Sequence, residues 1–371
     1  MTTLVARTNR GLIGEWWWTL DKVMLGIAAA LLLIGGVLVL SASPPVAERV
    51  FSAEMHYVKR HITVLPLAAL VMLAVSTLSA RGVLRTSQFF FGVFFILMLL
   101  TLAVGPEIKG AQRWLVRFGL QLQPSELLKP LLFVLIAWLL VTFTGWRGRL
   151  SAFVLTLAVL AVLAKQPDLG MAILIAVVFS TQLFVAGLNW FWVIAISSAG
   201  LGAMGLAYNI WDHFRRRIDQ FLDPDNLSYQ MEKALGAISH GGYFGTGPGE
   251  GVVKYHLPDA HADFIFAVTA EEFGVIACLV LAALFAFLFF RAVLRLEQTQ
   301  DRFVLIAGTG LATAIGLQAI VNMAVNINLM PTKGMTLPFI SYGGSSMIGT
   351  ALSMGLLLAL TRRRAKLEGR R

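Results

Sequence analysis

Two histidines and two aspartates stand close together just before a long apolar run. They are His256, Asp259, His261 and Asp263, and the apolar run extends from Phe273 to Phe290. Carboxylate and imidazole groups can take a proton from a hydroxyl group, and both are ordinary ligands for divalent ions. An apolar run of this length is typical of a membrane span, so the four groups would act at the lipid–water boundary, where a lipid headgroup meets water.

Three interpretations of this segment are open. The four side chains could hold a metal ion tightly, although their spacing matches no strong metal motif. They could hold a divalent ion loosely together with the pyrophosphate of a substrate, or they could form a solvated loop end with an acid at a helix start. Asp263 weighs against the solvated loop end, because it directly precedes Phe264, Ile265 and Phe266, where an unpaired charge is costly.

Two further acids, Glu271 and Glu272, interrupt the apolar sequence a little later. Acids at such depth usually face a cavity or a partner group rather than lipid. Glu271 follows Asp263 at a spacing that corresponds in a helix to ~12 Å of rise and ~80° of rotation. We therefore expect both carboxylates to face one cavity.

The segment from Gly241 to Gly251 is rich in glycine and superficially resembles nucleotide-binding loops. Those loops need a preceding strand and a following helix in an α/β unit, and the sequence does not predict that context here. A tight irregular loop is favoured, because glycine permits positive φ angles and close backbone approach.

A helix start is predicted at Gln123-Pro124-Ser125-Glu126, because proline and an acid favour the first turn and Glu126 can pair with Lys129. This segment could equally line a substrate groove, since it follows several basic and aromatic residues at the outer mouth of the membrane. These residues are Lys109, Arg113, Trp114 and Arg117. The break from Lys165 to Asp168 is most simply a set of membrane-boundary residues.

The elements that must position these groups are membrane helices. Of the 371 residues, 57% are hydrophobic and only 13% are charged, against about 25% charged residues in soluble domains. The uncharged run from Leu169 to Trp211 is too long for one helix and breaks at Gly187 to Trp190. We predict an all-α integral membrane protein with ten transmembrane helices, at residues 23–42, 62–79, 88–105, 128–145, 150–164, 169–186, 190–210, 264–290, 303–326 and 339–361.

The basic residues predict the orientation. Lys and Arg of the short loops and of both chain ends fall on one side of the ten spans, which is therefore the cytoplasmic side. We expect one domain over residues 1–371, with a large extracytoplasmic loop at 210–262 between the seventh and eighth spans. Much of the net charge of +10 is then explained by topology and by attraction to anionic lipid. No nucleic acid is expected as a partner, because the basic residues are dispersed among membrane loops.

Five ordered motifs are spread over nearly the whole chain: Lys109 to Trp114, Gln123 to Glu126, Gln166 to Gly170, His261 to Ala267, and Pro331 through Ser346. They resemble the motifs of the SEDS family of FtsW and RodA, and their residues are more similar to FtsW, the division member, than to RodA, the elongation member. Departures include Ala262, where threonine is usual, Pro248 between two glycines, and His240, where a small residue is usual. None of them removes the acid at Asp263.

The resemblance implies a peptidoglycan glycosyltransferase of the bacterial cytoplasmic (inner) membrane, which polymerises lipid II on the outer face. It implies that Asp263 is the catalytic base and that undecaprenyl pyrophosphate is the leaving group. Basic residues would bind that pyrophosphate, and other polar residues of the motifs would line the substrate site. The candidate substrate-binding residues are Lys109, Arg113, Trp114, Glu126, Lys129, Arg217, Lys254, His261, Glu271, Lys333, Ser341 and Ser345.

The resemblance further implies a class B penicillin-binding protein and divisome proteins as partners. The reaction needs either no cofactor or a divalent cation, Mg or Mn, that arrives with the substrate pyrophosphate. A lipid II flippase is the rival interpretation, but it needs a polar path through the whole bilayer and no repeat in the sequence supports alternating access. A scaffold for other wall proteins is a third interpretation, and it predicts that Asp263 is dispensable.

Overall fold

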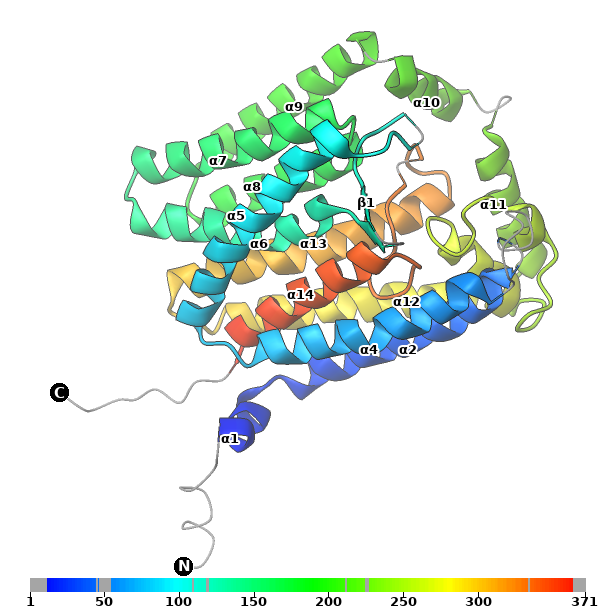
Figure 1. Ribbon diagram of the computed structural model, residues 1–371, viewed down its shortest axis with the longest axis horizontal. Coiled ribbons are helices and arrows are strands. Elements are labelled where there is room, and N and C mark those ends of the chain that lie inside the picture. Colours follow the sequence, from blue (N-terminus) through cyan, green and yellow to red (C-terminus); the bar gives the residue numbers. More distant parts are fainter. Residues whose placement is uncertain are drawn as a thin grey trace, which may run out of the picture.

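The computed structural model is a bundle of long helices that run side by side (Figure 1). It describes residues 12–44, 46, 55–108, 110–117, 120–210, 212–223, 227–332 and 334–362. The helices are α1 (Leu12–Thr19), α2 (Lys22–Ala42), α4 (His56–Ser76), α5 (Ala80–Val104), α6 (Pro124–Thr142), α7 (Trp146–Lys165), α8 (Leu169–Val185), α9 (Trp190–Ile210), α10 (Asp212–Leu222), α11 (Tyr229–Gly241), the 3₁₀ helix η2 (Val253–His256), α12 (Ile265–Leu296), α13 (Arg302–Asn326) and α14 (Gly344–Leu360).

Seven of the described helices are long and apolar enough to cross a membrane, namely α2, α4, α5, α6, α7, α12 and α13. Helices α8 and α14 are also apolar but shorter. The predicted all-helical, multi-pass membrane fold is confirmed. One small addition is a two-stranded antiparallel hairpin of β1 (Leu115–Arg117) and β2 (Leu120–Leu122), which lies in a segment predicted only as an outer loop.

The core lies around α6, α13 and α14. Helices α6 and α13 are the most buried of the long apolar helices, whereas α4 and α5 leave most of their surface open. A helix that is apolar all round belongs in the centre of a bundle, and this is where α6 and α13 lie (Figure 1). The N-terminal ends of α6 and α14 both lie toward the end of the bundle that carries β1 and α11 (Figure 1).

Helix α12 is broken at Gly274, where the backbone has a φ of 79° and a ψ of 173°. The prediction of one continuous span at 264–290 is therefore wrong in detail. A break exposes backbone N–H and C=O groups that are costly to leave unpaired near lipid. Glu271 and Glu272, which lie three and two residues before Gly274, carry two of the freed carbonyl groups.

The glycine-rich segment that follows α11 fills this break. Thr246 and Gly247 donate backbone N–H groups to the carbonyls of Glu271 and Glu272 at 2.9 and 3.0 Å, and Val275 donates to the Gly242 carbonyl at 3.0 Å. A Cβ atom on Gly245 would lie 2.2 Å from the Glu272 carbonyl oxygen, which leaves no space for a side chain there. The interpretation as a tight loop of close backbone approach is confirmed.

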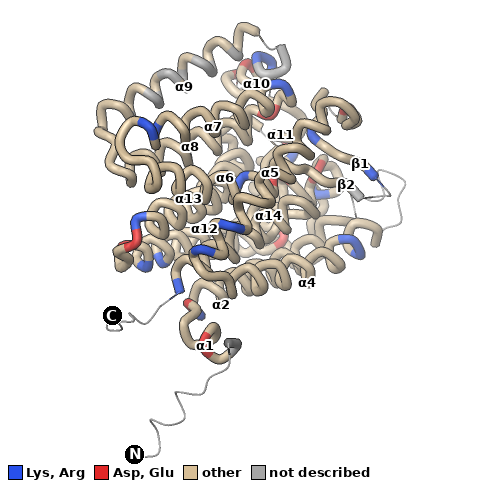
Figure 2. Tube along the Cα trace, turned by 60° about the vertical axis from the view of Figure 1, so that its left-hand side comes forward, with Lys and Arg blue, Asp and Glu red and all other residues tan. Residues whose placement is uncertain are grey.

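The other end of the bundle is held by Asp21. This residue caps α2 by accepting the N–H groups of Val23 and Met24, and its carboxylate pairs with Arg291 at 3.1 Å and with Arg295 of α12. Although burial raises the pKa of Asp21, the cap and the two guanidinium groups outweigh it and leave the pKa below its usual value. Lys and Arg gather around this end, where α1 and the end of α14 also lie (Figure 2).

Candidate active site

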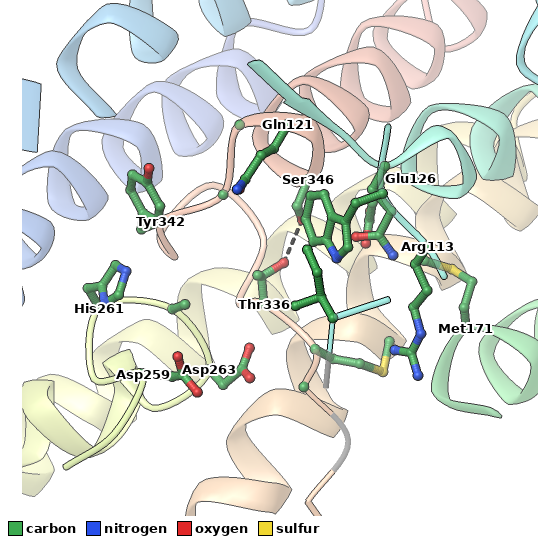
Figure 3. A pocket seen from close by; sticks show the side chains of 18 of the residues that line it. Arg113, Gln121, Glu126, Met171, Asp259, His261, Asp263, Thr336, Tyr342 and Ser346 are labelled. Atoms are coloured by element: carbon green, nitrogen blue, oxygen red, sulfur yellow. Dashed lines mark hydrogen bonds between the residues drawn. The ribbon is translucent and has the colours of Figure 1, made fainter. Parts of the chain in front are cut away.

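A polar cavity of about 440 Å³ opens at the end of the bundle that carries β1 and α11. Its walls come from segments far apart in the sequence: the start of α4, the connection between α5 and α6, the turn before α8, the turn before α12, and the connection from α13 to α14. Figure 3 shows Asp259 and Asp263 beside each other near His261, while Arg113 and Glu126 lie across the cavity.

Asp263 is held in place through its backbone, which leaves its carboxylate group at the cavity wall. The side-chain amides of Asn322 and Asn326, both on α13, donate to the Asp263 carbonyl oxygen at 3.0 Å each. Asn326 also accepts the backbone N–H of Ala267 at 3.0 Å, which ties the first turn of α12 to α13. These two asparagines therefore orient Asp263 through its backbone carbonyl group rather than through its carboxylate group.

The connection between α13 and α14 is bound to the turn that carries Asp263. Ser341 donates its hydroxyl to the Ala262 carbonyl at 2.6 Å, and the Tyr342 N–H donates to the His261 carbonyl at 2.9 Å. The His261 ring packs against Tyr342 and against Tyr57 of α4, with centroids 4.9 and 4.7 Å away. Ser341 thus supports the turn that carries Asp263 without lining the cavity, whereas His261 lines the cavity.

Arg113 is fixed on the opposite wall by the turn between α7 and α8. Its guanidinium group donates to the carbonyl oxygens of Pro167 at 2.5 Å and Gln166 at 3.2 Å, and it lies 3.5 Å from the Asp168 carboxylate. Burial raises the pKa of Asp168, while the charge of Arg113 opposes that rise. Asp168 caps the start of α8 and also lines the cavity beside Arg113 and Trp114, so this break contributes to the cavity wall in addition to its structural role.

Glu126, in the first turn of α6, lies at the cavity wall and pairs with Lys129 at 2.6 Å, as predicted. Lys129 is buried below the cavity, where Gln318 of α13 accepts a second hydrogen bond at 2.7 Å. Ser345 also lies behind the wall, since its hydroxyl accepts the N–H of Gln123 at 2.9 Å. The structure therefore brings Glu126 into the cavity but not Lys129 or Ser345.

Lys254 and Glu271 lie outside the cavity, which corrects two expectations. Glu271 accepts the backbone N–H groups of Val253 and Lys254 at 2.7 and 2.9 Å, and Lys254 forms a fully buried ion pair with Glu272 at 2.5 Å. Asp263 belongs to a turn before α12, so helical geometry does not relate it to Glu271. Lys254 and Glu271 thus both connect the segment that follows the glycine-rich loop to the broken helix α12.

The comparison with known families is decisive. The family model for FtsW, RodA and SpoVE, described as cell cycle protein, matches residues 21–366. The chain belongs to this family.

Relatives within the family cover nearly the whole chain. A probable peptidoglycan glycosyltransferase FtsW of Caulobacter vibrioides is 40% identical over 98% of this chain and 94% of its own. Another from Geobacter sulfurreducens is 38% identical over 92% and 95%. The rod shape determining protein RodA of Thermus thermophilus has a TM-score of 0.70 at 29% identity, covering 94% and 99%.

A further solved structure comes from a study titled as the structural coordination of polymerization and crosslinking by a peptidoglycan synthase complex. Its matching chain has a TM-score of 0.77 at 30% identity and covers 93% of this chain and 98% of its own. The resemblance seen in the motifs is thus confirmed at the level of sequence and of fold.

Three of the predicted basic site residues cannot be placed. Lys109 and Lys333 lie outside the residues that the structure describes, and for Arg217 only the backbone, in α10, is described.

Within the described residues, no group of three or more His, Cys, Asp or Glu side chains could hold a metal ion. Asp259 and Asp263 lie beside each other at one wall, and two further carboxylates, Glu126 and Asp168, line the cavity opposite them.

Sequence reasoning missed Arg60, which lines the cavity from α4. Its guanidinium group hydrogen-bonds the Tyr342 side chain, where its charge opposes the rise that burial causes in the pKa of Tyr342. Arg60 stands outside every recognised motif, beside Lys59, in a stretch assigned to a loop end. Only the packing of α4 against α14 brings it to the site.

Proposed function

We propose that this protein is a peptidoglycan glycosyltransferase that polymerises lipid II into glycan strands on the outer face of the cytoplasmic membrane. The observation that carries the proposal is a carboxylate, Asp263, that faces an arginine, Arg113, across a polar cavity at one end of a membrane bundle. The printed names of the relatives support the same reaction class.

The reaction joins a sugar hydroxyl of an acceptor to the anomeric carbon of a donor. Asp263 accepts the hydroxyl proton as the new carbon–oxygen bond forms, and the bond from that carbon to undecaprenyl pyrophosphate breaks with inversion. Arg113 neutralises the leaving pyrophosphate, to which its planar guanidinium can donate two parallel hydrogen bonds. Lys109 and Lys333 are proposed to add charge there, and Glu126, His261 and Trp114 to contact the sugars.

We further propose ten membrane crossings with both termini in the cytoplasm. Each of the ten predicted spans coincides with a helix, including α8, α9 and α14. The basic residues around α1 and the cytoplasmic end of α12 favour this orientation. The cavity then opens outward, where the headgroup of lipid II lies.

Septal synthesis with a class B penicillin-binding protein is proposed as the cellular role, because the Caulobacter and Geobacter relatives are named FtsW and a matching chain comes from a synthase complex. The elongation role of RodA is the alternative. A flippase is disfavoured, since Lys129, Glu126 and Gln318 form a buried, hydrogen-bonded cluster at the floor of the cavity. A divalent ion, if required, would be held by Asp259, Asp263 and the pyrophosphate, and would add positive charge.

The direct test is to incubate the purified full chain, with and without a class B penicillin-binding protein, with labelled lipid II. Polymer should appear in at least one condition and be absent without the chain. Repeating the assay with a chelator and then with added Mg²⁺ or Mn²⁺ decides whether an ion is needed. Failure to form any polymer with the partner present would reject the proposed function.

A further inference from the structure

Two glutamine side chains line the cavity from the small hairpin that precedes α6. Gln121 lies in β2 and Gln123 follows that strand with an extended backbone, and both line the cavity, whereas Leu122 between them does not. Successive side chains of an extended chain point to opposite faces, so residues two apart share one face. The hairpin therefore presents two carboxamide groups to the cavity, and Figure 3 shows that of Gln121 among the lining groups.

Ser345, in the first turn of α14, fixes the backbone of both residues. Its hydroxyl group accepts the N–H of Gln123 at 2.9 Å and donates to the Gln121 carbonyl oxygen at 3.4 Å. A hydroxyl group can donate and accept at once, so one serine serves both contacts. The side-chain carboxamides take no part in these contacts, and among the described residues neither carboxamide has a hydrogen-bonding partner.

Other polar groups at the cavity wall are engaged by the protein itself. Arg113 binds two carbonyl oxygens of the α7–α8 turn, and Glu126 pairs with Lys129. The hydroxyl groups of Thr336 and Ser346 bind each other. The two carboxamides are therefore open to a ligand, and each offers one acceptor and two donor positions without a charge. Such groups suit an uncharged polar ligand rather than an ion.

The sugars of lipid II carry such a group, the acetamido group. The N–H and the carbonyl of a trans amide point in opposite directions, so one carboxamide cannot bind both. Two carboxamides can, if one donates to the acetamido carbonyl and the other accepts from its N–H. Residues two apart in an extended chain lie roughly 7 Å apart. This spacing is similar to the span of an amide with a hydrogen bond of ~2.9 Å on either side.

The position of the hairpin indicates which sugar is bound. Arg113, which holds the leaving pyrophosphate in the proposed function, lies in the same connection between α5 and α6. We propose that Gln121 and Gln123 together bind the acetamido group of the donor sugar that is bonded to this pyrophosphate. This inference rests on the proposed glycosyltransferase function. It makes the hairpin the element that selects acetylated amino sugars as donors.

The test compares two labelled donors, each with its acceptor hydroxyl capped so that it can act only as donor. One is lipid II, and the other has a hydroxyl group in place of the acetamido group on the pyrophosphate-linked sugar. Unlabelled lipid II is the acceptor, and the full chain is assayed with its penicillin-binding partner. The wild type should prefer the natural donor in kcat/KM by roughly 5- to 100-fold, the range for two neutral hydrogen bonds.

The double variant Gln121→Ala/Gln123→Ala should bring this ratio close to one by slowing the natural donor only. Because both donors are measured on one preparation, a loss of folded protein does not change the ratio. Gln220→Ala is the matched control, since Gln220 is exposed on α10 and does not line the cavity, and it should keep the wild-type ratio.

Single glutamate variants test the division of roles between the two carboxamides. A carboxylate accepts hydrogen bonds but cannot donate them, whereas its shape is close to that of the amide. Of Gln121→Glu and Gln123→Glu, one should therefore keep the preference for the natural donor and the other should lose it. If both variants keep the preference or both lose it, the binding of one acetamido group from two sides is rejected.

The remaining outcomes separate the two levels of the proposal. If the wild type uses both donors equally well, or if the double alanine variant keeps the wild-type ratio, the acetamido subsite is rejected while the glycosyltransferase function stands. If the wild type joins neither donor to the acceptor, the proposed function and the subsite fall together.

Discussion

Asp263 is positioned through atoms that take no part in the proposed chemistry. Asn322 and Asn326 hold its carbonyl oxygen, and Ser341 holds the carbonyl of the preceding residue, while the carboxylate group stands at the cavity wall. A substitution that keeps the backbone and the side-chain shape should leave all three hydrogen bonds intact. Chemistry and folding can therefore be separated at this position.

We predict that Asp263→Asn loses polymerisation but folds normally. The amide cannot accept the hydroxyl proton, and loss of a general base typically lowers the rate by ~10² to 10⁴. Turnover of lipid II is measured beside the thermal unfolding of both proteins. Asp263→Glu should keep a small part of the activity, because the carboxylate is present but displaced from its attack geometry. A normal rate in the Asn variant would revive the scaffold interpretation.

Arg113→Ala should lower the polymerisation rate and also loosen the turn between α7 and α8, because the guanidinium group binds the carbonyls of Gln166 and Pro167. Arg113→Lys should restore the charge but not this pair of hydrogen bonds, so we expect partial recovery of activity. Initial rates at limiting lipid II provide the measurement. Equal activity of wild type and Arg113→Ala would reduce Arg113 to a structural residue.

At the scale of elements, the break in α12 and the glycine-rich loop form one unit. A Cβ on Gly241 would lie 2.0 Å from the Ala270 carbonyl oxygen, whereas one on Gly236, also in α11, would meet nothing closer than 3.9 Å. We predict that Gly241→Ala lowers the free energy of unfolding by about 1–3 kcal/mol. Gly236→Ala should be neutral or stabilising, because alanine favours a helix interior. Thermal unfolding of the two variants compares them directly, and equal stability would contradict the close packing.

The cap at Asp21 predicts a pH dependence. Its pKa is lower in the folded protein than the usual 3.8, so its contribution to stability is fully present above that value and is lost as the pH falls through the folded pKa. Asp21→Asn should be less stable than the wild type at neutral pH, and the difference should shrink as the pH falls below about 4. Parallel unfolding curves over pH provide the measurement. A difference that did not change with pH would assign the effect to the cap alone.

The break in α12 also shows where sequence reasoning stops. Gly274 resembles any glycine in an apolar run, and its role depends on Gly242 and Gly245, which lie about thirty residues earlier. Period and hydropathy report on neighbours along the chain, so they predict that a helix is present but not which loop inserts into it. For the same reason, the sequence did not reveal that Glu271 lies outside the cavity that Asp263 lines.

At the scale of the whole molecule, the fold class followed from composition because a membrane leaves few alternatives to apolar helices. The placement of Asp263, Arg113 and Glu126 around one cavity agrees with the motif pattern, since these three residues lie in or beside connections between helices at the same end of the bundle. Arg60 could not be predicted, because its approach to the site depends on the packing of α4 against α14 and on no local pattern.

The proposed orientation predicts opposite labelling of two engineered thiols. Ser239→Cys, exposed on α11, should react with an impermeant maleimide from outside the cell, whereas Gln300→Cys, exposed between α12 and α13, should react only after the membrane is opened. The native Cys278 is buried and gives little background. The reverse pattern would place the cavity on the cytoplasmic side and exclude a reaction on the outer face.

The hydrogen bonds around Asp263 also determine when the site can form during synthesis of the chain. The groups that orient this residue come from α13 and from Ser341, which the ribosome adds only after most of the chain has been inserted. A nascent chain can therefore hold Asp263 and the first eight of the ten proposed spans in the membrane while the site is still unformed. Chains that stall or are cleaved before residue 341 would occupy the membrane and bind neighbours without joining any sugar.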